Sequence, residues 1–227
     1  MLLGAIQLQL KSGLVRPGNK VVITGSGPLL VLVACQLHKA GCQVEAIYEA
    51  AKFSSVAKET LAMLNRPQQA LDGLSMMWYL KQHNIPLHYG WGLVKAEGVR
   101  QLNEVTVAPY DDNWFPDHSQ AVTHVVDTLG VGYGFAARSQ LAQLIGLDIE
   151  YDHMSGAIPA VDKWQRSSQE NIFCAGDSAK IAGADAAMLE GKIAAKAIAC
   201  ELGKLGSADA EPVSYTHLTL PTIAEVE

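Results

Sequence analysis

The sequence lacks the cysteine spacings that mark redox and metal modules. Its four cysteines include no C-x-x-C pair, which argues against a dithiol redox couple, a zinc site or an iron–sulfur cluster within the chain. Cysteines that follow no such pattern are expected to be small buried hydrophobic side chains. No metal site is predicted: Asp117, His118 and His124 lie in loop and strand positions without a tight ligand motif, and we interpret them as structural.

Long apolar runs and basic stripes are also missing. No segment is long and apolar enough to span a bilayer, and the first residues are not typical of a signal peptide. The chain has 17 basic and 23 acidic residues and a formal net charge of −6, so nucleic acid is not an expected partner. The expected location is the cytoplasm, with any peripheral membrane association arising only through partners.

The amino-acid composition is that of an ordinary α/β protein with enough hydrophobic residues to form a core. Hydrophobic residues make up 49% of the 227 residues and charged residues 18%. That composition and length suit one large domain or two modest ones.

One stretch has the pattern strand, glycine turn, helix, strand. Lys20–Thr24 is a β-branched run, which is typical of a parallel strand covered on both faces. Leu29–Ala40 is apolar nearly all round and is followed by Gly41, so it predicts a helix that packs against a sheet. Gln43–Tyr48 is the next expected strand.

The turn between the first strand and the helix predicts a dinucleotide site. Glycines there let a ligand approach the main chain, and the helix N-terminus offers free N–H groups to a pyrophosphate. A carboxylate about twenty residues further on accepts hydrogen bonds from the ribose hydroxyls, and it disfavours a 2′-phosphate, so NAD is expected over NADP. The expected nucleotide-binding residues are Gly25, Ser26, Gly27, Pro28, Leu29 and Glu49.

The glycine pattern is incomplete, because Leu30 replaces the third glycine of G-x-G-x-x-G. Helix and strand would then lie further apart, and the alternative reading is a structural βαβ turn without a ligand.

The next segments predict helices and a third parallel strand at Leu87–Tyr89. Lys52–Asn65 is expected to be helical. A second helix places four side chains on one face: Leu74, Met77, Trp78 and Lys81. We expect its Met76, Met77 and Trp78 to pack in the core rather than to line a cofactor site.

An antiparallel meander is expected after this strand. Leu93–Val99 and Glu104–Pro109 alternate apolar and polar residues, and Ala121–Thr128 and Leu129–Val131 form a further extended run. A βαβ unit, a meander and a returning strand together are the plan of a nucleotide-binding domain inserted into a flavoenzyme.

The last third of the chain predicts a different unit. A helix is expected over Arg138–Ile145, and Ile172–Ala175 is predicted to be a buried strand that leads into Gly176 and Asp177. The following helix, Gly183–Ala195, is rich in small residues, which permit close approach to a sheet or a cofactor.

Three motifs together resemble flavoproteins with two dinucleotide-binding domains. They are Thr24–Leu29, Val131–Phe135, and Ala175–Asp177 with the Gly183–Gly191 helix. Within that class the sequence is most similar to the group formed by opine oxidase A subunits and hydrogen cyanide synthase B subunits. These are FAD-containing subunits of heteromeric dehydrogenases that oxidise an amino acid or imino diacid at a carbon–nitrogen bond. The resemblance runs from about Leu8 to about Leu202.

The resemblance implies cofactors and roles for matching positions. Gly25, Gly27 and Pro28 match the phosphate turn of the NAD(P) domain, and Gly132 falls in the second motif. Gly176 and Asp177 match the second FAD motif, in which the aspartate accepts a hydrogen bond from the ribityl chain of the flavin. The alternative for Asp177 is a helix cap after Gly176.

The expected fold is therefore α/β, with a Rossmann-like NAD-type domain that carries a meander, plus the C-terminal part of an FAD-binding domain. We assign 1–19 to a linker or remnant of the FAD domain, 20–131 to the NAD(P) domain and 132–212 to the FAD part. Residues 213–227 are expected to be a non-native tail, because VSYTHLTLPT resembles the translation of a transposon-based sequencing adapter. The first FAD motif and a cysteine-rich iron–sulfur module are not found, so a fragment is expected.

The predicted function is that of an FAD-dependent oxidoreductase subunit that acts on an amino or imino acid and works with a partner oxidoreductase subunit. Two alternatives remain: an NAD(P)H-dependent flavoprotein reductase of an iron–sulfur partner, and a stand-alone NAD-binding module without catalysis. No catalytic acid or base is assigned, since nothing in the spacing gives Tyr133 or His153 a role.

Overall fold

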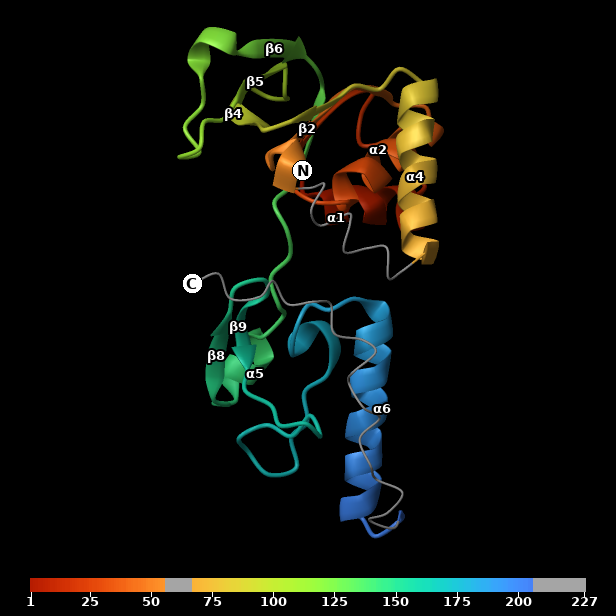
Figure 1. Ribbon diagram of the computed structural model, residues 1–227, viewed down its shortest axis with the longest axis vertical. Helices are drawn as coiled ribbons and strands as arrows, with labels where there is room; N and C mark the ends of the chain where they lie inside the picture. The colour runs from red at the N-terminus through yellow and green to blue at the C-terminus, as the bar shows by residue number, and fades with distance from the viewer. Residues whose placement is uncertain (56–66, 206–227) are drawn as a thin grey trace. The chain divides into compact units, whose positions relative to one another are not determined.

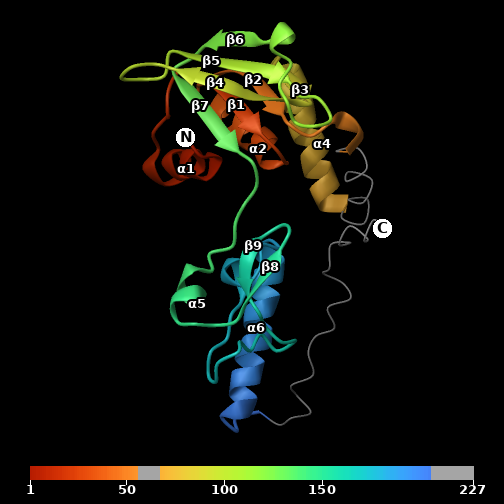
Figure 2. The same ribbon diagram turned by 90° about the vertical axis from the view of Figure 1, so that its left-hand side faces the viewer.

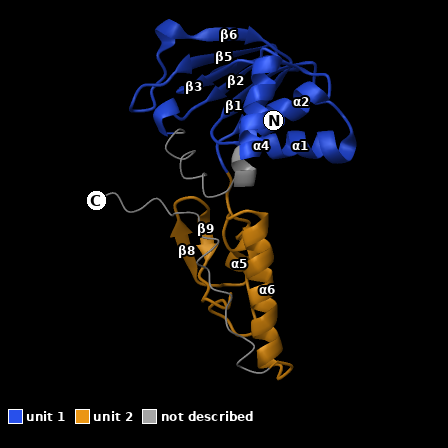
Figure 3. Cartoon of the chain, turned by 45° about the vertical axis from the view of Figure 1, so that its right-hand side comes forward, with its two compact units in different colours: residues 1–134 blue, residues 135–227 orange. Residues whose placement is uncertain are grey.

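The computed structural model of the protein describes residues 1–55 and 67–205 and the side chains of all of these except 67–70 (Figure 1). It divides into two compact units, Met1–Gly134 and Phe135–Glu227 (Figure 3). Among the described helices, none has both the length and the apolar character needed to cross a lipid bilayer. Most of the expected helix Lys52–Asn65, and the expected non-native tail 213–227, lie outside the described residues.

The first unit is built on a parallel sheet, which confirms the Rossmann-like α/β prediction. Its strands are β1 (Lys20–Gly25), β2 (Gln43–Glu49), β3 (Leu87–Tyr89) and β7 (Thr128–Gly132). They lie in the order β3-β2-β1-β7, and each pair is parallel (Figure 2). The central β1 is buried from its second residue onward, as its run of valine and isoleucine predicts.

Helices cover one face of this sheet. They are α1 (Leu3–Leu8), which continues as a π-helical turn over Gln9–Gly13, α2 (Leu29–Lys39) and α4 (Pro67–Gln82). Val21 and Ile23 of β1 pack against α2 in the larger hydrophobic cluster, which also takes Leu80 from α4. Because side chains alternate along a strand, Val22 faces the other side of the sheet.

An antiparallel sheet covers that second face. It consists of β4 (Trp91–Glu97), β5 (Glu104–Pro109) and β6 (Val122–Val125) in sequence order, with a 3-10 turn at His118–Gln120. Its Val105 and Val107 are fully buried against the parallel sheet. The predicted meander and the return to a parallel strand are thus both present.

The face of helix α4 that packs in the core differs from the face that the sequence predicted. Leu74, Met77 and Trp78 are 67%, 41% and 66% exposed, so the expectation that Met77 and Trp78 pack in the core is wrong. Leu80 is buried in the cluster beneath the helix and Met76 packs against it. The helix is apolar around much of its circumference, so periodicity could not tell which face meets α2.

The segment before β1 belongs to the first unit. Leu3 and Ile6 of α1 are 2% and 0% exposed within its core, and Leu2 forms a parallel bridge with Val131 of β7. The expected boundary at residue 19, which separated this segment from the NAD-type domain, therefore differs from the division seen in the structure.

The second unit is smaller and has less regular structure. It contains α5 (Gln140–Leu144), a hairpin of β8 (Ile149–Asp152) and β9 (Gly156–Pro159), a 3-10 turn at Gly176–Ser178, and the long helix α6 (Ala184–Glu201).

One expected element of this unit is absent. Ile172–Ala175, predicted to be a buried strand, is only partly buried and makes a single isolated bridge, between Phe173 and Arg166. The amide of Cys174 donates to the carbonyl of Gln165, so this segment pairs with a nearby loop. A β-branched or aromatic run becomes a strand only where a neighbouring strand supplies its hydrogen bonds.

Candidate functional site

The predicted nucleotide residues meet at the carboxyl edge of the parallel sheet. Gly25, the last residue of β1, lies in register with Glu49 at the end of β2 and with Gly132 at the end of β7. Glu49 in turn pairs with Tyr89 at the end of β3. Ligands of open α/β sheets bind outside this edge, so the register assembles one site from four strand ends.

The turn after β1 packs tightly against β7. A β-carbon on Gly25 would lie 1.8 Å from the carbonyl oxygen of Gly132, so only glycine fits there. The Ser26 amide donates to the same oxygen at 2.7 Å. These contacts fix the direction in which the turn enters α2.

At the start of α2, one backbone N–H is without an acceptor among the described residues. Pro28 occupies the N-cap position of α2 with φ −65° and has no N–H to satisfy. The N–H of Leu29 has no acceptor among residues 1–55 and 67–205, whereas that of Leu30 donates to Gly27 at 3.2 Å. Leu30, which stands in place of the third glycine, is completely buried in the core.

The carboxylate of Glu49 ties the turn to the end of β2. Glu49 is 6% exposed, and its Oε2 accepts the Gly27 amide at 2.8 Å while Oε1 accepts the Ala51 amide at 2.9 Å. Each carboxylate oxygen has a further lone pair for another donor, such as a ribose hydroxyl. The sequence predicted a ligand role for this residue and missed its role in holding the turn.

A second buried carboxylate organises the Gly176 motif of the other unit. The Gly176 amide donates to Oε2 of Glu190 at 2.7 Å, and Glu190, on α6, is 6% exposed. Gly176 adopts φ +70°, and a β-carbon there would lie 3.3 Å from Cβ of Ala187, so both backbone angle and space favour glycine. No role was predicted for Glu190; its only sequence signal was a charged residue within a helix of small residues.

Asp177 is exposed beside this motif. The 3-10 turn that contains it has no side-chain cap, and neither has α6, so the capping alternative is not what the structure shows. Its carbonyl oxygen accepts the Arg138 amide at 2.9 Å. The carboxylate has no hydrogen-bond partner in the described part of the chain, which leaves its oxygens available as acceptors.

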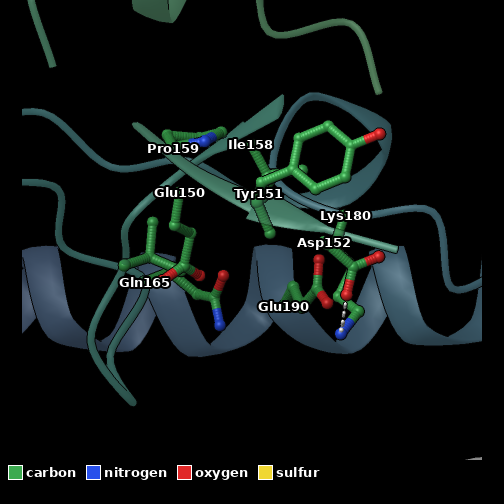
Figure 4. Close-up of a pocket in the computed structure, with 10 residues that line it drawn as sticks. Glu150, Tyr151, Asp152, Ile158, Pro159, Gln165, Lys180 and Glu190 are labelled. Carbon is green, nitrogen blue, oxygen red and sulfur yellow. Dashed lines mark ion pairs between the residues drawn. The ribbon is translucent and has the colours of Figure 1, made fainter. Parts of the chain in front are cut away.

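A cavity of about 330 Å³ lies next to the motif, between the β8–β9 hairpin and α6 (Figure 4). Its polar lining includes Glu150, Asp152, Lys180 and Glu190, and its apolar lining includes Ile158. Lys180 and Asp152 form an ion pair at 3.0 Å, and this interaction lowers the pKa of Asp152 to about 2.

The two motifs fit their expected cofactors in different ways. The edge of the first unit offers a close backbone approach at Gly25, an unpaired N–H at Leu29 and the Glu49 carboxylate, which together suit a dinucleotide. The second unit offers the exposed Asp177 carboxylate as an acceptor for a polyol chain.

Two of the three residues considered as a candidate metal cluster, Asp117 and His124, have other hydrogen-bond partners. The Nε2 atom of His124 lies 2.7 Å from the hydroxyl of the buried Tyr48, and Asp117 accepts the Ser119 amide at 3.0 Å. In the part of the chain that the structure describes, no three potential ligands gather around one point.

Comparison with known proteins shows similarity to a family of oxidoreductases. Residues 4–191 match the family described as pyridine nucleotide-disulphide oxidoreductase. The chain is 51% identical over 218 residues to the hydrogen cyanide synthase subunit HcnB of Pseudomonas aeruginosa, covering 96% of this chain and 47% of that protein. It therefore spans about half the length of this relative.

Two more distant similarities accompany this match, one in sequence and one in fold. The A subunit of opine oxidase from Rhizobium meliloti is 27% identical over 207 residues, which cover 88% of this chain and 43% of that protein. An FAD-dependent pyridine nucleotide-disulphide oxidoreductase from Desulfovibrio vulgaris superposes with a TM-score of 0.54 at 20% identity, covering 81% of this chain and 43% of the other.

Proposed function

The chain belongs to the pyridine nucleotide-disulphide oxidoreductase family, and we propose that it is part of an FAD-dependent subunit that oxidises an amino-acid-like or opine substrate at a carbon–nitrogen bond. The observation that carries this proposal is the 51% identity to a hydrogen cyanide synthase subunit across 96% of the chain. The similarity to an opine oxidase subunit supports the same substrate class. Both relatives are named as subunits, so a partner subunit is part of the proposal.

The chain's own residues hold the cofactors in this proposal. When bound, FAD supplies the acceptor for the hydride that leaves the substrate, and the protein positions it. Asp177 would accept a hydrogen bond from the ribityl chain, and Glu190 holds the adjacent Gly176 backbone in place through its hydrogen bond to the Gly176 amide. A partner subunit that carries an electron acceptor, such as an iron–sulfur centre, would complete the enzyme.

The test requires the longer protein, expressed together with its partner subunit, because the chain spans about half of its relative. We expect the complex to purify with bound FAD and its flavin absorbance to bleach anaerobically when an amino or imino acid is added. A matched Asp177→Asn variant should retain less flavin, while Asp148→Asn, which changes an exposed aspartate of the same unit outside the motif, serves as a control. A complex that binds no flavin contradicts the proposal.

A second candidate is an NAD(P)H-dependent reductase that passes electrons to an iron–sulfur partner. The Gly25–Gly27 turn with Glu49 favours it, because this edge suits a dinucleotide. Bleaching of the flavin by NADH, with no response to amino or imino acids, would select this function. Tight NAD⁺ binding without any flavin affinity would instead indicate a nucleotide-binding module.

A further inference from the structure

We propose that Phe53 and Tyr89 form the adenine-binding surface of the nucleotide site at the carboxyl edge of β3-β2-β1-β7. This inference rests on the proposed function, since it takes a dinucleotide to bind at that edge. It adds which side chains receive the base and which end of the sheet the base occupies.

The order of the strands gives the direction of the ligand. Starting from Gly25 at the end of β1, the register passes to Glu49 on β2 and then to Tyr89 on β3. In the ligand the order is pyrophosphate, ribose, adenine. With the pyrophosphate at the β1 turn and a ribose on Glu49, the base falls at the end of β3, about two strand spacings of about 4.8 Å from Gly25.

An aromatic pair stands at that position. The rings of Phe53 and Tyr89 meet edge to face, with centroids 5.3 Å apart and planes at 73°. Phe53 is 64% exposed, although a large apolar ring gains most when it is covered. Contact with Tyr89 orders the ring without burying it, so the base can stack on it at a small further cost in conformational entropy.

Tyr89 adds a polar group to this surface. Burial, and then the negative charge of Glu49, raise the pKa of Tyr89, so its phenol keeps its proton at neutral pH. The hydroxyl has no hydrogen-bond partner within residues 1–55 and 67–205. It is therefore an available O–H donor, and the ring nitrogens of adenine are acceptors.

Titration calorimetry of the 227-residue chain with NAD⁺ and ADP-ribose tests the inference. We expect Phe53→Ala to weaken binding of both ligands about tenfold, in the range that alanine substitution of a base-stacking aromatic residue produces. Phe53→Trp should restore the affinity. Trp78→Ala is the matched control, since it removes an equally exposed aromatic side chain from the outer face of α4.

The outcomes separate this inference from the proposed function. If wild-type protein binds NAD⁺ and Phe53→Ala binds it equally well, the adenine assignment is wrong and nucleotide binding stands. If wild-type protein binds neither ligand, the inference fails, while flavin binding and bleaching of the longer complex still decide the oxidase function. Thermal melts of each variant establish that the fold is retained.

Discussion

At the scale of single residues, two buried carboxylates hold the glycine turns on which both motifs depend. Glu49 accepts the amides of Gly27 and Ala51, and Glu190 accepts that of Gly176. A carboxylate suits these positions because it is an acceptor at both oxygens. The same residues that make a turn receptive to a ligand are thus kept in shape by acids on neighbouring elements.

Replacing Glu49 by glutamine should therefore destabilise the protein. Glutamine offers one acceptor oxygen where two amides need acceptors, so one partly buried N–H loses its partner, at a cost of about 1 kcal/mol. Glu45→Gln on the same strand is the control, since Glu45 makes only surface contacts, a 2.7 Å hydrogen bond from the Gln43 side chain and a loose 3.7 Å ion pair with Lys20, and should change stability by less than about 0.5 kcal/mol. Urea unfolding midpoints compare the two, and equal midpoints would contradict the role assigned to Glu49.

The Asp152–Lys180 pair predicts a pH dependence for the second unit. Lys180 lowers the pKa of Asp152 to about 2 in the folded protein, below its ordinary value. The ionised carboxylate is therefore stabilising at neutral pH, and this contribution is lost as pH falls from about 4 towards 2.

Asp152→Asn removes that contribution. The variant should be less stable than wild type at pH 7, and the difference should narrow at pH 3. Urea unfolding at pH 7, 4 and 3, followed by the fluorescence of the tryptophans, which include Trp164 in this unit, measures it. A stability difference that stays constant over this range would show that the ion pair is not the cause.

At the scale of elements, helix α4 has apolar side chains on two faces, one of which is buried and the other exposed. Leu80 is 3% exposed beneath the helix, whereas Leu74 and Trp78 are 67% and 66% exposed on the outer face. Only the inner face contributes to the core, so substitutions two residues apart should differ sharply in effect.

Leu80→Ala should lower the free energy of unfolding by about 2–5 kcal/mol, because it leaves a cavity in the cluster shared with α2. Trp78→Ala should change it by no more than about 0.5 kcal/mol, as surface substitutions usually do. Chemical denaturation of both variants measures the difference. A large loss for Trp78→Ala would mean that the outer face is covered in solution.

At the scale of the whole molecule, the two hydrophobic clusters found among residues 1–55 and 67–205 lie within the first unit. The cluster on the helix-covered face of the parallel sheet has buried residues from Leu3 to Ile85, and the cluster between the two sheets has buried residues from Val22 to Val126. A unit with its own core is able to fold independently.

We therefore expect residues 1–134 to fold on their own. The isolated segment should show dispersed amide signals in an NMR spectrum and a single cooperative unfolding transition. It should also bind NAD⁺ with the affinity of the full chain, since the edge of the sheet proposed to bind the nucleotide lies entirely within it. A fragment with collapsed but undispersed signals would show that the core requires residues beyond Gly134.

The sequence by itself determined the elements whose signals are local. The β-branched run of β1, the glycine turn, the helix of α2 and the acid at the end of β2 each lie within one continuous stretch, and the structure reproduces all of them. The alternating pattern of β4 and β5 likewise predicted the antiparallel pairing that is observed. Here propensity, periodicity and turn chemistry point to one answer.

Only the tertiary structure decided the matters that depend on partners distant in sequence. It placed α1 in the first core and turned α4 so that Leu80 faces inward, and it gave Ile172–Ala175 one isolated bridge in place of a strand pairing within the described residues. It also brought Tyr89 beside Glu49, and Glu190 beneath Gly176. A helix face or a β-prone segment is resolved by what packs against it, and a short sequence window does not contain that neighbour.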